Sequence, residues 1–85
     1  MNELRIIGLL ITDRIKEAGK TQQALTANAH IIKLRLGSHE VSEDKCSRVG
    51  FILLQVTGNQ NDFEKLETEL SKIGGIEIKQ MIFNY

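Results

Sequence analysis

The chain has 85 residues, enough for one domain with one hydrophobic core and too few for two. Its 41% hydrophobic and 26% charged residues are typical of a soluble globular protein. Eleven basic residues balance eleven acidic ones, which argues against binding to nucleic acid or an anionic membrane through bulk charge. The single cysteine, Cys46, excludes an intrachain disulfide, and we expect a cytoplasmic protein without a membrane segment.

The first half of the chain predicts a strand, a helix and a second strand. Leu4–Ile11 is apolar at nearly every position, which favours a strand covered on both faces. Thr12 or Asp13 can cap the helix that follows, and Gly19 costs that helix about 1 kcal/mol, so its first turns are expected to be irregular or the helix to start late. The apolar residues at helical spacing are Ile15, Ala18, Leu25 and Ala29. His30–Gly37 then alternates between apolar and polar residues, as in a strand with one wetted face.

The second half predicts the same succession after a polar loop at Ser38–Ser47. Phe51–Val56 is again apolar on both faces. Asn59 or Asn61 can cap the next helix, and two glycines at 74–75 supply a left-handed stop. The buried stripe of this helix is predicted to be Phe63, Leu66, Leu70 and Ile73. The last strand is predicted at Ile76–Phe83.

This order of elements, βαββαβ, predicts an α+β ferredoxin-like domain over residues 1–85. The expected sheet is antiparallel with strand order 4-1-3-2 and carries both helices on one face. The two strands that are apolar on both faces are those that this order places in the centre. Hydropathy and topology therefore agree.

Each central strand carries two apolar rows, although two helices on one face cover only one of them. The uncovered row predicts an interface. Burial of ~600 Å² per partner is worth on the order of 15 kcal/mol before association costs. We therefore expect a homodimer or tetramer joined through the sheet. The row assigned to this interface is Ile7, Leu9, Ile11, Ile52, Leu54 and Val56.

No motif in the sequence predicts catalysis or a resident cofactor. His30, His39 and Cys46 lack the paired spacing of a structural zinc site, so no metal is assigned. No nucleophile motif of the GxSxG type occurs. The Arg14 turn lacks the glycine cradle of acylphosphatases and the CxxC of copper chaperones, and Phe51 alone does not make the aromatic surface of an RNA-binding sheet. We expect no enzyme activity and name no catalytic residue.

Several short segments resemble the family of iron-only hydrogenase system regulators. They are Ile7-Gly8-Leu9-Leu10-Ile11 followed by Asp13-Arg14, Leu34-Arg35-Leu36-Gly37, Val56-Thr57-Gly58, and the spacing of Leu66, Leu70, Ile73 and Gly75-Ile76. The resemblance covers nearly the whole chain. It implies an ACT-like regulatory domain that forms oligomers through its sheet, senses a small molecule and acts through a partner protein.

In many ACT domains an effector lies near the turn after the first strand, and the resemblance carries this position to residues 12–14. Ile15 and Lys16 stand where amino-acid-binding ACT domains have a glycine. The candidate ligand-binding residues are Asp13 and Arg14, followed by Gly8, His39 and Glu40. Two alternatives stay open: a small dimeric enzyme of the α+β barrel type, and an interaction module without a ligand.

Overall fold

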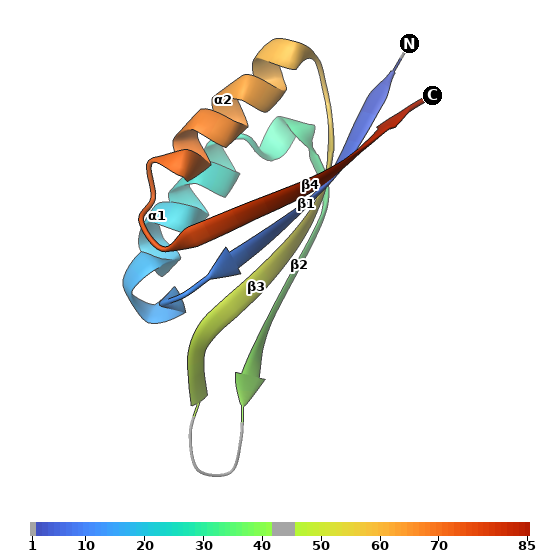
Figure 1. Ribbon diagram of the computed structural model, residues 1–85. Coiled ribbons are helices and arrows are strands. Elements are labelled where there is room, and N and C mark those ends of the chain that lie inside the picture. Colours follow the sequence, from blue (N-terminus) through green and yellow to red (C-terminus); the bar gives the residue numbers. More distant parts are fainter. Residues whose placement is uncertain (1, 42–45) are drawn as a thin grey trace.

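The computed structural model describes residues 2–41 and 46–85, with the backbone alone at 39–41 and 46–48 (Figure 1). Strand β1 (Glu3–Ile11) leads into helix α1 (Arg14–Ala27) and a single 3₁₀ turn at Ala29–Ile31. Strands β2 (Ile32–Val41) and β3 (Cys46–Thr57), helix α2 (Gln60–Ser71) and strand β4 (Ile76–Asn84) follow.

The four strands form one antiparallel sheet in the order β2-β3-β1-β4, and both helices lie on the same face of it (Figure 1). This is the ferredoxin-like α+β fold that the sequence predicts, with the two doubly apolar strands in the centre. The strands are longer than predicted. Part of the expected loop at Ser38–Ser47 is strand, since β2 continues to Val41 and β3 begins at Cys46.

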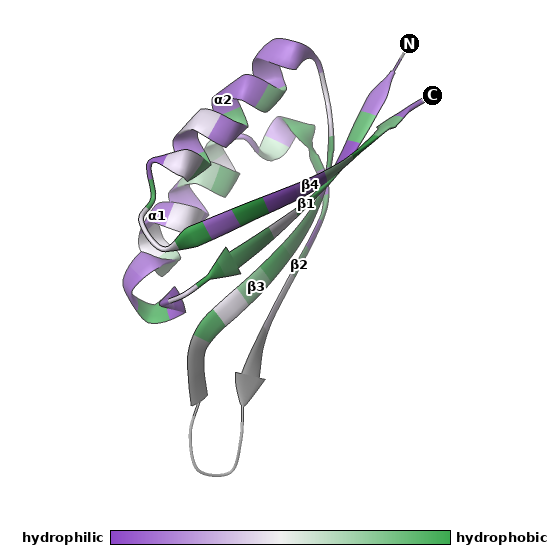
Figure 2. Cartoon of the chain, viewed as in Figure 1, coloured by the Kyte–Doolittle hydropathy of each residue, from purple (hydrophilic) through white to green (hydrophobic). Residues whose placement is uncertain are grey.

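The hydrophobic core lies between the helices and one face of the sheet (Figure 2). Six of the strand residues that face it are Ile7, Leu9, Ile11, Leu54 and Val56, all at most 5% exposed, and the half-buried Ile52. These six residues are the row that we assigned to the subunit interface, and that assignment is wrong. Both rows of the central strands are apolar, so hydropathy did not decide which row the helices would cover.

Helix α2 matches its sequence-based prediction. Asn59 caps it: its side chain accepts a hydrogen bond from the backbone of Asp62, whose carboxylate accepts one from the backbone of Asn59. The predicted stripe is buried, with Phe63, Leu66, Leu70 and Ile73 each at most 7% exposed. Gly75 has a φ of 73°, the left-handed conformation expected after the helix.

Helix α1 faces the core with a different side from the one predicted. Leu25 is buried as expected, but Ile15 is 60% exposed, and the helix is continuous from Arg14 despite Gly19. Its buried residues are Glu17, Thr21, Ala24 and Leu25. Because two of these four are polar, an apolar periodicity selects the wrong face of this helix.

A buried asparagine at the end of α1 joins the two helices. Asn28 is fully buried, and its Nδ2 donates hydrogen bonds of 2.7 Å to Ala24 O and to Glu69 Oε2 of α2.

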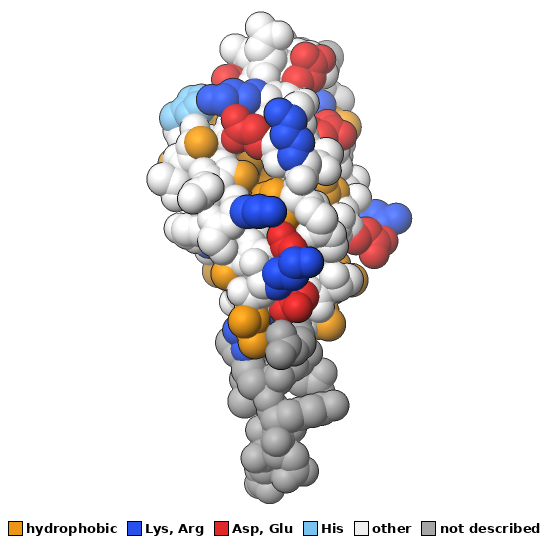
Figure 3. Space-filling view, turned by 90° about the vertical axis from the view of Figure 1, so that its left-hand side faces the viewer, with side chains coloured by type: hydrophobic (Ala, Val, Ile, Leu, Met, Phe, Trp, Pro, Cys, Tyr) orange, Lys and Arg blue, Asp and Glu red, His pale blue; other side chains and the backbone are white. Residues whose placement is uncertain are grey.

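The outward surface of the helix layer carries charges of both signs, interspersed (Figure 3). The helix side is therefore an ordinary wetted surface above a shared core.

The burial of Leu54 in the core and the exposure of Ile15 on α1 predict a contrast between two substitutions. Leu54→Ala should lower the free energy of unfolding by roughly 2–5 kcal/mol, because it leaves a cavity in the core. Ile15→Ala should change it by no more than about 0.5 kcal/mol, because that side chain is exposed. Urea unfolding followed by circular dichroism measures both. A loss of stability in Ile15→Ala as large as that in Leu54→Ala would contradict this assignment of the faces.

Candidate functional site

The face of the sheet away from the helices is apolar over its central and edge strands. In an antiparallel pair, directly opposed residues point to the same side, and the register places Ile6, Gly8 and Leu10 with Phe51 and Leu53 on this face. We call the following apolar side chains the open-face patch: Leu4, Ile6, Leu10, Leu34, Leu36, Phe51, Leu53, Met81 and Phe83. None of them is buried within the subunit.

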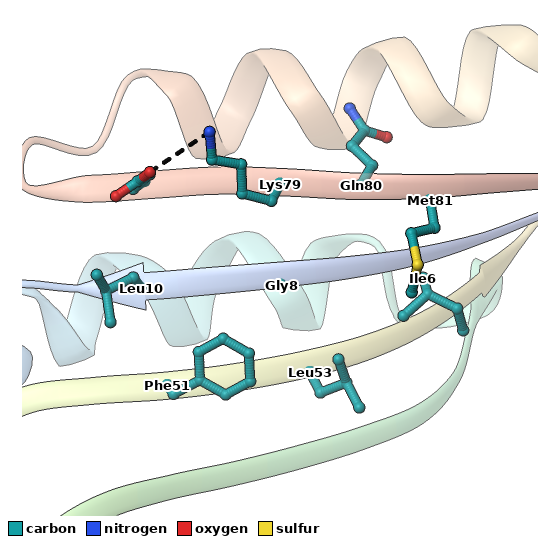
Figure 4. A pocket seen from close by; sticks show the side chains of 9 residues that line it. Ile6, Gly8, Leu10, Phe51, Leu53, Lys79, Gln80 and Met81 are labelled. Atoms are coloured by element: carbon teal, nitrogen blue, oxygen red, sulfur yellow. Dashed lines mark ion pairs between the residues drawn. The ribbon is translucent and has the colours of Figure 1, made fainter.

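A shallow apolar hollow of about 430 Å³ lies in the middle of this patch (Figure 4). Gly8 forms its floor, and a Cβ placed there would lie 3.3 Å from Cζ of Phe51, so the Phe51 ring occupies the space above the glycine. Lys79 and Glu77 form an ion pair of 3.6 Å at the β4 side. The open face therefore offers an apolar depression with one charge of each sign at its margin.

A second hollow, of about 260 Å³, lies on the helix side at the opposite end of β1 from the termini. We call it the arginine hollow. Helix α1 supplies one wall, and β2 and β3 supply the other. The hollow is lined by glycines and by side chains on the helix side of the sheet. These residues are Ile11, Arg14, Ala18, Thr21, Gln22, Arg35, Gly37, Gly50 and Ile52.

Two glycines explain why the arginine hollow is not filled. Gly37 is opposite the helix-facing Ile52, and a Cβ placed on it would meet nothing within 4 Å. Gly50 is opposite Ile11, and a Cβ there would lie 3.1 Å from Cβ of Arg14. The first glycine leaves the floor open, and the second allows the arginine side chain to lie against the strand.

The polar groups of the arginine hollow come from both walls. Arg35 of β2 donates a hydrogen bond from Nη2 to Oε1 of Gln22 on α1. Thr21 is 2% exposed, and its Oγ1 is buried without a hydrogen-bond partner among the described residues. An unsatisfied buried hydroxyl of this kind costs roughly 1–3 kcal/mol. Within the described part of the chain, the charged residues that line the hollow are the two arginines, Arg14 and Arg35.

The structure separates the candidate ligand-binding residues. Arg14 lines the arginine hollow, whereas Asp13 caps α1 and accepts a hydrogen bond of 3.2 Å from the backbone nitrogen of Lys16. Gly8 lies on the open face, on the other side of the sheet from Arg14. The side chains of His39 and Glu40 are outside the described residues.

Sequence reasoning missed Arg35, Gln22 and Thr21 as neighbours of Arg14. Arg35 was predicted to lie on the solvent-exposed face of an edge strand. It is exposed as predicted, but the prediction did not identify the residues that lie opposite it. The available signal was glycine in strands, at Gly37 and Gly50, because glycine within a strand often marks a close approach or an open site.

Among the described residues, no three His, Cys, Asp or Glu side chains are grouped so that they could hold a metal ion. The side chains of His39 and Cys46, which the sequence offered as potential ligands, lie outside that set. Neither α1 nor α2 has the length and apolar character needed to cross a membrane.

No protein-family model matches the sequence, and no curated protein is a significant match to it. Solved structures do match. An uncharacterised protein from Thermotoga maritima superposes with a TM-score of 0.81 at 21% identity, covering 99% of this chain and 100% of that one. A divalent ion tolerance protein from Ehrlichia chaffeensis gives 0.56 at 16% identity, covering 100% of this chain and 85% of that one.

The regulatory subunit of aspartate kinase from Thermus thermophilus also matches, with a TM-score of 0.57 at 24% identity. The match covers 95% of this chain and 55% of that subunit. At such identities these similarities show the fold alone. The chain is therefore a ferredoxin-like α+β domain, a class that includes small regulatory and binding modules.

The cap at the start of α1 gives a prediction that separates capping by the Asp13 side chain from the effect of its charge. Asp13→Ala should lower the free energy of unfolding by about 1 kcal/mol, because a backbone N–H of the first turn loses its acceptor. Asp13→Asn should keep the stability within a few tenths of a kcal/mol, because asparagine caps about as well as aspartate. Thermal or urea unfolding measures both, and equal losses in the two variants would show that the carboxylate charge, not the cap, is what matters.

Proposed function

We propose that this chain is a small-ligand-sensing regulatory module that works as a homo-oligomer joined through the open-face patch. The observation that carries the proposal is the uncovered second apolar face of the sheet. The resemblance to the iron-only hydrogenase system regulators, and through them to ACT-like domains, supports a role in controlling a metalloenzyme system or its transcription through a partner protein.

The size of the open face suits a second copy of the chain. Four strands ~4.8 Å apart, each of about nine residues at ~3.3 Å, make a face of roughly 600 Å². Stable interfaces bury about 800 Å² per partner, which is of the same order. The helix layer carries interspersed charges instead (Figure 3). The large exposed apolar patch, which is typical of an interface, is therefore on the sheet side.

The margin of the patch supports self-association over docking to an unrelated partner. A two-fold interface brings the same surface of two subunits together, so that surface must complement itself. Glu77 and Lys79 lie on the same face of β4, beside the hollow, and present one charge of each sign. A two-fold axis that passes between these two residues would place each charge opposite the unlike charge of the second copy.

The arginine hollow supplies the sensing half of the proposal, because it is on the side of the sheet that self-association leaves free. Within the described residues its lining contains no His, Cys, Asp, Glu or Lys, the side chains that most often transfer protons or attack substrates. This composition favours binding over catalysis, and thus a sensor over the small α+β barrel enzyme. One of the solved structures similar to this chain, the aspartate kinase subunit, is a regulatory subunit, which supports the proposed class of function.

A charge placed in the patch tests the oligomer. Leu53→Glu, opposite Gly8 in the centre of the open face, should convert an oligomeric wild-type chain into a monomer, because the interface would bury an unpaired carboxylate. Ile15→Glu makes the same kind of change at an exposed apolar residue of the helix side and should leave the subunit number unchanged. Native mass spectrometry measures both. A monomeric wild-type chain at micromolar concentration, or an oligomer that survives Leu53→Glu, would overturn this interface.

A further inference from the structure

We infer that the arginine hollow binds a small organic carboxylate, whose charge lies between Arg14 and Arg35. The inference rests on the proposed ligand-sensing function and names the chemical class of the ligand.

The two arginines approach the hollow from different elements. Arg14 begins α1 and lies against Gly50 of β3, whereas Arg35 comes from the edge strand β2 and is held to α1 by its hydrogen bond to Gln22. A guanidinium has five donors in a planar fork, so each can keep a protein partner and still donate to a ligand. Two arginines in the lining of one hollow suit a carboxylate, which accepts hydrogen bonds in pairs.

A buried hydroxyl in the wall adds an unsatisfied polar group beside the two charges. Thr21 lines the hollow, is 2% exposed, and its Oγ1 has no partner among the described residues. Buried hydroxyls are rarely left in this state. Thr21 Oγ1 has almost no surface open to the hollow, so a carboxylate or hydroxyl oxygen of a ligand would accept its hydrogen bond after the Thr21 side chain turns toward the hollow.

The remaining walls and the volume limit the ligand further. Ile11, Ala18 and Ile52 give the hollow an apolar side, which suits a short hydrocarbon portion better than inorganic phosphate. The volume of about 260 Å³ lies below the ~300–1,000 Å³ of pockets that hold drug-sized ligands, so the hollow suits a smaller molecule. Glu17, one turn before Thr21 on the same buried face of α1, does not line the hollow. The expected ligand is therefore a mono- or dicarboxylate with a short carbon chain.

The test follows backbone amide signals of the full-length chain by ¹H–¹⁵N NMR during titration at constant ionic strength. The added molecules are butanoate, succinate, inorganic phosphate and the neutral butanamide. We expect butanoate or succinate to shift the signals of residues around the hollow, among them Thr21, Gly37 and Gly50. We expect butanamide to bind at least about tenfold more weakly than butanoate, since charge-assisted hydrogen bonds are the strong ones.

Three variants locate the site. Arg35→Gln should weaken carboxylate binding at least about tenfold, because it removes one charged donor. Gly37→Leu should abolish binding, because its side chain enters the open floor where a Cβ meets no neighbour. Lys20→Gln removes one positive charge from an exposed position of α1 outside the hollow and should leave the affinity within about twofold, as expected for a screened surface charge.

Each other outcome overturns the inference. Equal weakening by Arg35→Gln and Lys20→Gln would mean non-specific charge attraction, and preferential binding of phosphate would exclude the carboxylate class. Binding of butanamide as tight as that of butanoate, or shifts centred outside the hollow, would overturn the anion site and leave a ligand sensor standing. No shift with any of the four molecules would overturn the carboxylate site. Failure of the proposed oligomer appears separately, in the subunit number of the wild-type chain.

Discussion

The four-stranded sheet has both helices on one face, and no other described part of the subunit covers its second face. In this chain the central strands β1 and β3 are apolar on both sides, so the helices of the subunit can bury only one of their two apolar rows. The covered row, centred on Leu9 and Leu54, makes the core. The uncovered row makes the open-face patch, and the depression above Gly8 belongs to it. Core, patch and the proposed self-association are thus consequences of one uneven arrangement of layers.

The topology was predictable from the sequence because each element carries its own local signal. Helix α2 has a capping box, an apolar stripe and a left-handed glycine, and all three are in place. Two of the errors, the row assigned to the interface and the buried face of α1, share a cause. Where both rows of a strand are apolar, periodicity does not choose a face. In α1, where Glu17 and Thr21 are buried and Ile15 is exposed, periodicity chooses the wrong face. In both places tertiary packing, not local pattern, decided the outcome.

The candidate site was predictable only in part. Arg14 was identified from its place after the first strand, a local property. Its neighbours Arg35, Gln22 and Thr21 come from α1 and from the edge strand, and they meet across the layer boundary only after the sheet forms. The glycines at 37 and 50 are visible in the sequence. A glycine in a strand indicates an open floor, however, only when the face of the sheet on which it lies is known. Predicting which of these residues meet requires the register between neighbouring strands, and a single sequence does not supply it.

Strand pairing between β1 and β4 continues to the ends of the described chain. Asn2 and Tyr85 exchange two backbone hydrogen bonds, of 2.8 and 2.9 Å, so the first and last of these residues are neighbours. Both lie at the pole of the molecule opposite the start of α1 (Figure 1). A tag, tether or further domain joined at either end would leave from the same corner. A short linker between the two ends would close the chain into a ring, which suits this domain to circular permutation and to insertion into another protein.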